Sequence, residues 1–554
     1  MAEQLYFSRD TRLIAQFRNT TDNTETAASL GLGDCWEIPI LDGYSFSQAT
    51  NTSEITLAEM ESTAGISRRG RRMFTDSLAP AEWSFSTYIR PFDSKAGSVT
   101  PSGSRAADTA TEVHAVEEVL WASMFGADTY SSSLFSRATN PDATNAGAVV
   151  TPGASSSVIK IAESNRSALH SLVLYFWIDT DASNPLMYRL PEAVVNEVSV
   201  DFDVDGIATL NWSGFAKEVI DVSGKIKVNA VRPTVGNTTN DSTTLALGDI
   251  WIDTGNAQGR TFNLVKSLPG SGQLATSNVT QAIDEGTSST KNFIRNRLTS
   301  VDIEAATSTD KVDTIFPGRH ATITGLTKAD PAVATSTAHG FAVGDVVYIT
   351  GTCGITTSSV DVLQNLAHTI TAVSANTFTI GALDTSSSSG TFSASSLQAH
   401  NGKYSLVLTG GSFNIANNIT YLVPEELGAI NKPLEHVTGT RTSTGNATCY
   451  LTLNDTDLSS GTSRQFFNDL VSTGAMSKVV NKFKVTMHIG GATATGNSTD
   501  PALKIEFPTA HIEVPSHQVE DVISMETNFQ ALPTDFGTAN EITAITYYPV
   551  DDYA

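Results

Sequence analysis

The feature that most restricts how this chain can fold is an alternation of apolar and polar residues in the stretch 36–92. There Tyr44-Ser-Phe-Ser and Trp83-Ser-Phe-Ser-Thr-Tyr each place every second side chain on one face. A period of two is that of a half-buried β-strand. We therefore expect a pair of strands here. The long loop between them carries four basic residues, Arg68, Arg69, Arg71 and Arg72.

The same order of elements returns later in the chain. Gly411-Ser-Phe-Asn-Ile corresponds to the Phe46 run, and Cys449-Tyr-Leu-Thr-Leu corresponds to the Trp83 run. A first strand, a helix and three later strands also recur in order, at 12–13 and 297–298, 112–125 and 463–471, 172–178 and 483–489, 191–205 and 508–522, and 210–215 and 525–529. A repeat of whole elements indicates a tandem duplication.

One spacing differs between the two copies. Leu13 precedes Phe46 by 33 residues, whereas Leu298 precedes Phe413 by 115 residues. The surplus of 82 residues is the size of a small domain, and its short strand-like runs between Gly, Asp and Asn turns favour a small barrel or sandwich. We predict copy 1 at 1–221, a Ser/Thr/Gly-rich connector or small β insert at 222–290, copy 2 at 291–304 and 402–554, and an inserted decoration domain at 305–401.

These patterns predict a mainly β (α+β) fold. Each copy consists of strands, one helix and further strands, which favours a β-sandwich or barrel with one flanking helix. In the first copy the helix is expected over 112–125, where Val116, Val119, Leu120 and Phe125 fall near one helical face.

The chain is strongly acidic, with 34 Lys and Arg against 58 Asp and Glu and a net charge of −24. Binding to nucleic-acid phosphates requires clustered Lys and Arg, and the only dense cluster is the one at 68–72. The acidity favours solubility; alternatively, it would let a polyanion pass without adhering. The three cysteines have neither metal-site nor disulfide spacing. With no signal-peptide pattern and no apolar run near the roughly 18 residues of a membrane span, we expect synthesis in a reducing cytoplasm.

No catalytic, metal-binding or cofactor-binding constellation is recognisable, so we expect neither enzyme activity nor a cofactor. His339 stands alone in Ala-His-Gly-Phe, which favours a packing role, and His511 and His517 lack partners at metal spacing. Three acidic residues, Asp201, Asp203 and Asp205, alternate on one face of a strand. A Ca²⁺ site is one interpretation and a solvated acidic face is the favoured one. If that face lined a channel, it would repel phosphates.

Three stretches of the repeated region resemble the tail tube proteins of tailed bacteriophages. They are Tyr44-Ser-Phe-Ser-Gln-Ala-Thr-Asn-Thr, Arg68-Arg-Gly-Arg and Glu82-Trp-Ser-Phe-Ser-Thr-Tyr-Ile-Arg-Pro. The stretch from Val514 to Phe529 is similar to the C-terminal part of that family. The resemblance covers both copies but neither the connector nor the insert. The insert, through His339-Gly-Phe and Gly344-Asp345, resembles small β modules of phage structural proteins.

The resemblance implies two packed sheets and one flanking helix per unit, six units in a ring, and rings stacked into a β-lined tube. With two units in one chain, three chains would complete a ring of pseudo-six-fold symmetry. The loop with Arg68, Arg69, Arg71 and Arg72 would contact a neighbouring subunit or ring, and Asp201, Asp203 and Asp205 are the candidate acidic face of the channel or surface. Expected partners are further copies of the chain, a sheath or tail terminator, a baseplate, and viral DNA that passes without sequence-specific binding. The expected location is the virion tail, after synthesis in the host cytoplasm.

Three other functions stay open at this point. They are the tube of a contractile secretion device, a baseplate or tail-hub ring that does not polymerise, and a glycan-binding or hydrolytic tail protein. The large insert favours a virion over a secretion device, because outward decorations are tolerated there. A glycoside hydrolase would need paired carboxylates in a cleft, and the sequence shows no such pair.

Overall fold

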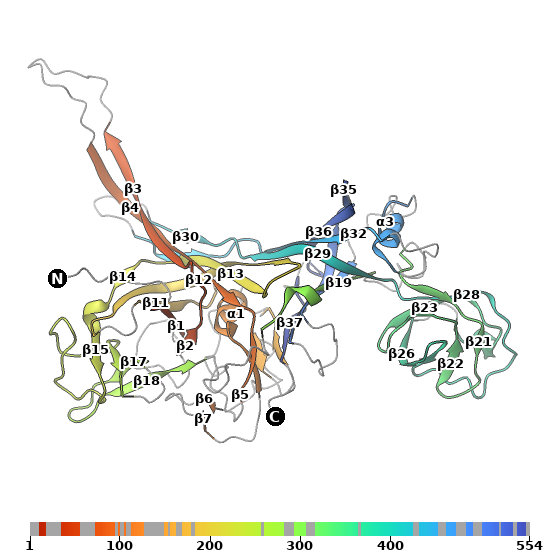
Figure 1. Cartoon of the computed structure of the whole chain (residues 1–554), viewed down its shortest axis with the longest axis horizontal. Coiled ribbons are helices and arrows are strands. Elements are labelled where there is room, and N and C mark those ends of the chain that lie inside the picture. The colour runs from red at the N-terminus through yellow and green to blue at the C-terminus, as the bar shows by residue number, and fades with distance from the viewer. Residues whose placement is uncertain are drawn as a thin grey trace, which may run out of the picture.

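The computed structural model describes residues 10–17, 35–55, 72–94, 98–99, 105–106, 112–126, 149–152, 156–161, 169–178, 183–255, 260–281, 293–305, 316–363, 367–424, 432–452, 461–472, 483–490, 501–519, 522–535 and 540–549. Strands dominate these residues, and two α-helices accompany them. A long sheet crosses the upper side of the molecule, the arm formed by strands β3 (Ser45–Ile55) and β4 (Arg72–Tyr88) projects at one end, and a separate small sheet lies at the other end (Figure 1). The fold is mainly β, as the sequence patterns predict.

Seven strands of the first half form one hydrogen-bonded series in which every pairing is antiparallel. The order is β2 (Cys35–Ile38), β1 (Arg12–Phe17), β11 (Leu172–Ile178), β12 (Leu186–Asp203), β13 (Thr209–Ala216), β4 (Arg72–Tyr88) and β3 (Ser45–Ile55). Strand β12 is 18 residues long, and its two ends pair with different strands, β11 first and β13 afterwards. The predicted turn at Asp205-Gly206 joins β12 to β13.

The second half repeats this order of pairing. The series is β19 (Ser300–Ala305), β33 (Phe483–Gly490), β34 (Ala502–Ile512), β36 (Ile523–Ala531), β32 (Thr442–Tyr450) and β29 (Lys403–Ala416), again antiparallel throughout. Strand β29 takes the place of both β2 and β3, because its first residues pair with β19. A short strand, β35 (Ser516–Val519), follows β34 and pairs with β36. The two halves therefore share their strand order.

One helix accompanies each series. Helix α1 (Glu118–Phe125) is buried along its whole length, and α3 (Ser463–Leu470) begins after Thr462, whose hydroxyl accepts a hydrogen bond from the Gln465 N–H. The first helix is shorter than the predicted 112–125, because β8 (Glu112–Ala115) pairs with β5 (Pro91–Ser94). That pairing holds the chain extended to Ala115, and the helix begins at Glu118, the acidic residue of its first turn.

A connector sheet covers the outer face of the first half. It consists of β15 (Ile226–Asn229), β16 (Ile250–Asp253), β17 (Thr261–Ser267) and β18 (Ala275–Gln281), and β18 continues in parallel onto β2. The face beneath it is apolar: Tyr175 and Trp177 pack there with Ile252 and Phe262. Burial of this area removes apolar surface from water and attaches the connector sheet firmly to the first half.

The corresponding outer face of the second half is charged and polar. Lys403 Nζ lies 2.9 Å from Asp302 Oδ2, and His488 Nε2 lies 3.7 Å from the same carboxylate oxygen. Lys504 and Glu506 pair at 3.1 Å on the neighbouring strand. This face borders an open cleft, whose other wall is formed by residues 342–346. The two halves thus share strand order but differ in what their outer faces can pack against.

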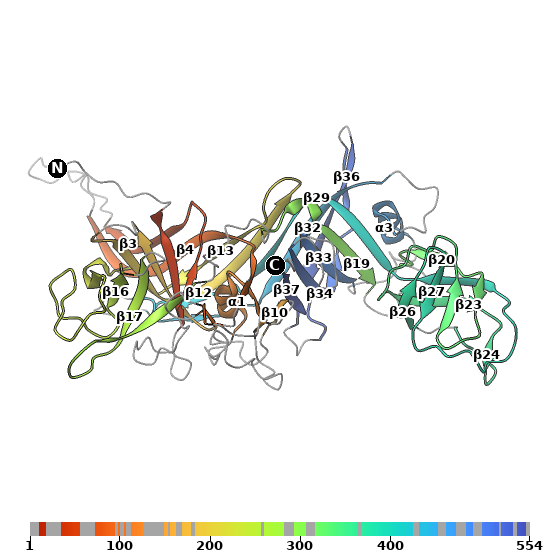
Figure 2. The same ribbon diagram turned by 60° about the horizontal axis from the view of Figure 1, so that its bottom comes forward.

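A separate seven-stranded sheet lies within residues 320–400, at one end of the molecule in Figure 2. Its strands are β20 (His320–Thr322), β21 (Gly325–Leu326), β22 (Ala332–Thr335), β23 (Val346–Thr352), β26 (Ala367–Val373), β27 (Thr377–Ile380) and β28 (Ser395–His400). It has a core of its own around Ile349 and Phe378, whereas Phe316 packs against Phe483 in the main core. Buried His339 is within hydrogen-bonding distance of the carbonyls of Ser374 and Thr377, at 2.9 and 3.1 Å, which is the packing role that its isolation predicts.

The main core extends across both halves without a break. Trp121 of α1 lies against Trp212 of β13 with ring centroids 4.9 Å apart. Its indole N–H donates to the Tyr547 hydroxyl in β37 (Ala544–Tyr548), and that hydroxyl donates to Glu117. Strand β37 also links the halves by pairing with β34 and with β10 (Ser157–Ile159), which in turn pairs with β9 (Val150–Pro152). Burial raises the pKa of Glu117 to about 8, against the opposing effect of the Tyr547 hydrogen bond.

The buried Glu117 predicts how stability depends on pH. The carboxyl has a pKa of about 8 when folded and 4.5 as a free group. Its contribution to stability is therefore complete below about pH 4.5 and is lost as the pH rises through 8, at up to about 1.4 kcal/mol per pH unit. Glu117→Gln should flatten this fall of the free energy of unfolding between pH 5 and 8, measured by denaturant titration. The control Glu82→Gln, which alters an exposed carboxyl, should keep the wild-type slope, and an unchanged slope in Glu117→Gln would contradict the assignment.

Candidate functional site

One continuous antiparallel sheet runs through both halves of the chain. Its strand order is β3, β4, β13, β12, β29, β32, β36 and β35. The two halves meet where β12 pairs with β29, in a register that runs from Glu197 opposite Ala416 to Asp203 opposite Gly410. The sheet consists of two successive series of four strands, β3-β4-β13-β12 and β29-β32-β36-β35, and is the long sheet along the top of Figure 1.

The two faces of this sheet differ because the strands alternate. Trp83, Trp212, Val200, Phe413 and Met525 point into the core and are at least 98% buried. The opposite face, which we call the polar face, carries mainly short polar side chains. They are Ser45, Ser47, Glu82, Ser84, Ser86, Glu197, Ser199, Asp201, Asp203, Asn211, Ser213, Ser412, Asn414, Thr444, Asn446, Thr448, Ser516, Gln518, Glu526, Asn528 and Gln530.

Cross-strand hydrogen bonds tie the polar face together. The hydroxyls of Ser45 and Ser84 lie 2.8 Å apart, and Ser86 donates to Asn211 at 2.7 Å. The two halves are linked in the same way, because the Asn414 side-chain amide donates to the Glu197 carboxylate at 2.5 Å. Such pairs stabilise neighbouring strands of a sheet, so the face is a fixed pattern of donors and acceptors.

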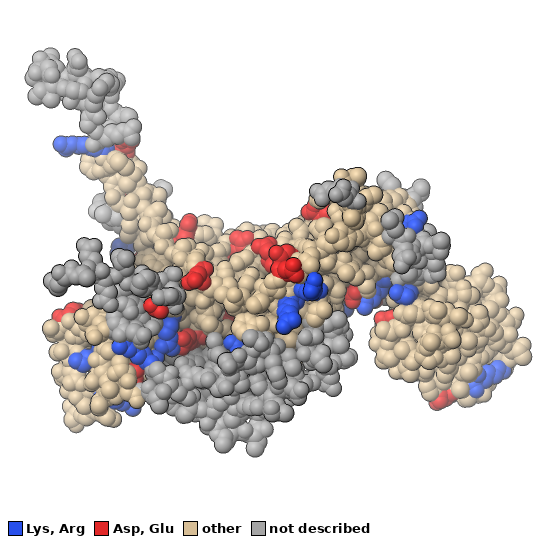
Figure 3. Space-filling view, in the orientation of Figure 1, with Lys and Arg blue, Asp and Glu red and all other residues tan. Residues whose placement is uncertain are grey.

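The polar face is acidic. In the parts of the strands that build it (45–48, 81–88, 197–203, 209–216, 408–416, 442–450, 516–519 and 523–531) there is no Lys or Arg. Its carboxylates are Glu82, Glu197, Asp201, Asp203 and Glu526, and none of them forms an ion pair among the described residues. Acidic atoms are visible along the upper side of the molecule in Figure 3.

The structure places the predicted acidic trio on and beside this face. Asp201 and Asp203 are exposed in the last part of β12, and Asp205 follows in the turn to β13. Within the described residues, no group of three or more His, Cys, Asp or Glu is arranged to hold a metal ion. All three residues are exposed, and their role as an acidic face of a channel or surface stays a prediction.

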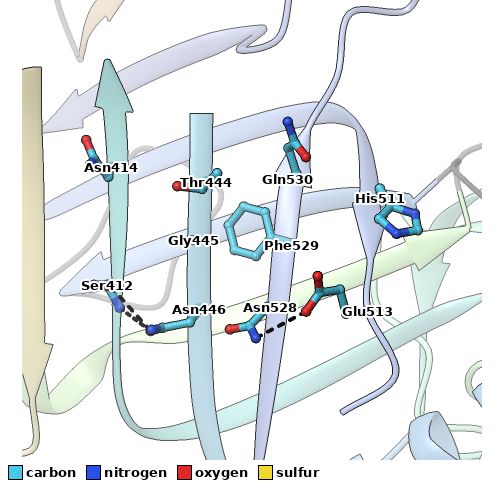
Figure 4. Close-up of a pocket in the computed structure, with 10 residues that line it drawn as sticks. All are labelled: Ser412, Asn414, Thr444, Gly445, Asn446, His511, Glu513, Asn528, Phe529 and Gln530. Carbon is cyan, nitrogen blue, oxygen red and sulfur yellow. Dashed lines mark hydrogen bonds between the residues drawn. The ribbon is translucent and has the colours of Figure 1, made fainter. Parts of the chain in front are cut away.

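An open depression of about 340 Å³ lies on the second half of the polar face. Figure 4 shows that Asn414, Thr444 and Asn528 line it, with His511 and Glu513 at one side. The Ser412 N–H donates to the Asn446 side-chain oxygen at 2.8 Å, and the Asn528 amide donates to Glu513 at 3.3 Å. Ser412 and Thr444 are the hydroxyl residues of this lining, and the Ser412 hydroxyl donates to the Asn446 side-chain oxygen at 3.4 Å. The depression therefore presents side-chain hydrogen-bond donors and acceptors.

Each half places a glycine beside an aromatic ring at the same point of the sheet. Gly214 in β13 is opposite Trp83 in β4, and Gly445 in β32 is opposite Phe529 in β36. A Cβ added to Gly214 would lie 2.5 Å from the Trp83 ring, and one added to Gly445 would lie 2.5 Å from the Phe529 ring. Strand β13 corresponds to β36, and β4 corresponds to β32. The same two positions are therefore occupied in both halves, but the glycine and the aromatic residue have exchanged strands.

The predicted basic loop is only partly within the described residues. Arg68, Arg69 and Arg71 lie outside them, and Arg72 is the exposed first residue of β4, opposite Ile55. Next to it on the arm, Met73 and Phe74 are 60% and 58% exposed. The outer part of the arm thus presents apolar side chains directly beside the basic sequence.

The sequence patterns predict the strands around Phe46 and Trp83 but not most of the polar face in the second half. Alternation at Thr444 and Asn446, and again at Glu526 and Asn528, would have revealed it. The residues of the second copy that correspond to the Trp83 run also differ from the expected Cys449 run. Trp83 lies opposite Phe46, and Gly445 lies opposite Phe413. Gly445 is therefore the counterpart of Trp83 in the second copy.

No protein-family model matches the chain. Over 141 residues the chain is 34% identical to the tail tube protein pb6 of Escherichia phage T5, a stretch that amounts to 26% of this chain and 28% of that protein. The match thus spans little more than a quarter of the relative's length, and over that stretch it supports the expected likeness to tail tube proteins. None of the helices in the described residues is sufficiently long and apolar to traverse a membrane.

The close packing at Gly214 predicts a strong effect of a small substitution. In Gly214→Ala the new methyl group would lie 2.1 Å from the Val194 carbonyl oxygen as well as against Trp83. Overpacking of this kind costs about 1–3 kcal/mol of the free energy of unfolding. Gly410→Ala, with its nearest atom at 3.6 Å in the same sheet, is the matched control and should change stability by less than about 0.5 kcal/mol. Equal stabilities of the two variants in denaturant titrations would contradict the packing described here.

Proposed function

We propose that this chain is a structural subunit of a bacteriophage tail tube, and that its polar face lines the channel through which DNA passes. The observation that carries the proposal is the continuous sheet of two four-strand series, with a polar face that has carboxylates and no Lys or Arg in its described strand segments. The partial similarity to the tail tube protein pb6 supports the same role.

The chain contains two tandem tube units in this proposal, and three chains complete a ring of six units. The shared strand order of the halves supports the duplication, as does the glycine–aromatic pair at the same point of each sheet. The insert (305–401) and the connector (222–290) are then additions to a duplicated core. Both small sheets lie away from the polar face in Figure 1, which supports their placement on the outside of the tube.

The acidic face suits the passage of DNA because duplex DNA carries about one negative charge per 1.7 Å. A protein adheres to DNA when its Lys and Arg side chains neutralise phosphates. The counterions that were condensed on the DNA are then released, which lowers the free energy. A wall with Glu82, Glu197, Asp201, Asp203 and Glu526 offers no such contact and repels the backbone at short range. DNA therefore remains free to slide along it.

The β3–β4 arm is the proposed contact between neighbouring subunits or stacked rings. It combines exposed Met73 and Phe74 with the basic run Arg68, Arg69, Arg71 and Arg72. Apolar contact supplies affinity, and basic residues that meet acidic partners set orientation and register. The other expected partners are tail components at the two ends of the tube and, in a contractile tail, a sheath.

Electron microscopy of the purified chain tests the function directly. We expect stacked rings of three chains with six similar lobes around an open channel. Rings of six chains would keep the tube and overturn the duplication. Single rings that never stack would favour a hub or baseplate component, and a chain that stays monomeric at high concentration would overturn the proposal.

The basic run can be tested separately from ring formation. Replacement of Arg68, Arg69, Arg71 and Arg72 by Ala should abolish tube growth, because the charge complementarity between neighbours is lost, while single rings persist. Tube length by electron microscopy and sedimentation are the measurements. Lys328→Ala, which removes an exposed cation from the small sheet at 320–400, is the control and should leave tube length unchanged. Tubes of normal length from the four-residue variant would contradict the role of the loop.

A further inference from the structure

The continuous sheet ends in two strands that have one partner strand each among the described residues. Strand β3 pairs with β4, and β35 pairs with β36. All four residues of β35 are exposed, Val519 by 78%. A free strand edge is a template for pairing with another chain. The two edges lie at opposite ends of the sheet in Figure 1, so one chain cannot join its own edges.

The β12–β29 junction between the halves shows how such edges can pair. There the last seven residues of β12 pair antiparallel with the last seven of β29, without a register shift. Within each half, β29 occupies the place of β3: Phe413 lies opposite Gly445, as Phe46 lies opposite Trp83. The junction is therefore a pairing between the end of one four-strand series and the start of the next.

Strand β35 likewise occupies the place of the end of β12. Counted from the glycine–aromatic pair, Asn211 precedes Gly214 by three residues, and Glu526 precedes Phe529 by three. Ser199 lies opposite Asn211, and Ser516 lies opposite Glu526. The two free edges, β35 and β3, are thus the counterparts of the two strands that already pair within the chain.

We infer that β35 of one chain pairs antiparallel with β3 of a second copy, in the register of the β12–β29 junction. The inference rests on the proposed tube and names the surface by which its chains join. Since Ser199 lies opposite Asn414 and Asp201 opposite Ser412 in the junction, the same register places Ser516 opposite Ser47 of the next chain and Gln518 opposite Ser45 of the next chain. Three of these residues are serines and the fourth is a glutamine, so all four are polar and uncharged. They continue the polar face.

Backbone directions support this pairing. In the junction the Asn417 N–H donates to the Asn196 carbonyl at 2.8 Å, so residues 196, 198, 200 and 202 face β29. Because Ser516 corresponds to Ser199, His517 and Val519 correspond to residues 200 and 202. Their backbone N–H and C=O groups therefore point to the free edge of β35. Pro515 at the preceding position has no N–H, which is the arrangement tolerated at a sheet edge. The pairing is therefore carried by residues 516–519, and the His517 ring is held beside it by Phe467 of α3, with ring centroids 4.3 Å apart.

The register can be tested by disulfide formation between chains. Because Ser199 and Asn414 are a non-hydrogen-bonded pair, their counterparts Ser516 and Ser47 should have Cα atoms about 4.5 Å apart, within the range of a disulfide. The double variant Ser47→Cys/Ser516→Cys of the full chain, assembled and oxidised, should give covalent dimers and trimers on a non-reducing gel, with no larger species. The three native cysteines are buried and do not compete.

Two matched variants control for chance encounters. Ser47→Cys/Gln518→Cys moves one cysteine by two residues along the same exposed strand, to a diagonal distance of about 7–8 Å, and should yield at least tenfold less covalent trimer. Ser199→Cys/Asn414→Cys places the pair in the β12–β29 junction and should form its disulfide within a single chain. Equal yields from the in-register and displaced pairs would overturn the register.

The outcomes separate this inference from the proposed function. Rings in the electron microscope without covalent dimers or trimers would overturn the β35–β3 pairing and leave the tube intact. A covalent ladder that continues to six chains would support the pairing and overturn the three-chain ring. If the wild-type chain forms no ring at all, the tube proposal fails and the pairing fails with it.

Discussion

The pairing of β12 with β29 is the contact on which the rest of the structure depends. It turns two series of four strands into one sheet and places Val200 beside Phe413 in a core that both halves share. The Asn417 amide reinforces the crossing by donating to the carbonyls of Met124 and Val195. Buried backbone groups need such partners, so the relative position of the halves is fixed by hydrogen bonds as well as by apolar contact.

The length of β12 makes this contact possible. Its first part belongs to the outer layer beside β11, and its last part belongs to the long sheet, with a register irregularity between Val195 and Glu197 at the transition. Irregularities of this kind bend a strand and increase its twist. A single strand therefore holds the two layers of the first half in register. In the second half the same path is divided between β34 and β35, with Pro515 between them.

The sequence predicts the structural features that depend on neighbouring residues. It does not predict those that depend on contacts between residues far apart in the chain. Alternation around Phe46 and Trp83 specified strands correctly, and the isolation of His339 indicated its packing role. The predicted start of α1 was wrong because β8 pairs with β5, a strand about twenty residues away, and is therefore extended. The correspondence of Trp83 with Gly445 was hidden because a glycine and an aromatic residue exchange places across two strands. The β12–β29 junction leaves no local signature, since an edge strand and a paired strand can have the same alternation.

The two outer faces described above have a consequence for the symmetry of any assembly. The connector sheet seals an apolar face over the first half, whereas the second half presents Asp302, Lys403 and His488 beside the small inserted sheet. The inner wall of a three-chain ring would repeat six times, but its outer surface would repeat only three times. In the proposed tube, a protein that recognises the outside would bind with a stoichiometry of three per ring, while DNA in the channel would meet a nearly six-fold environment.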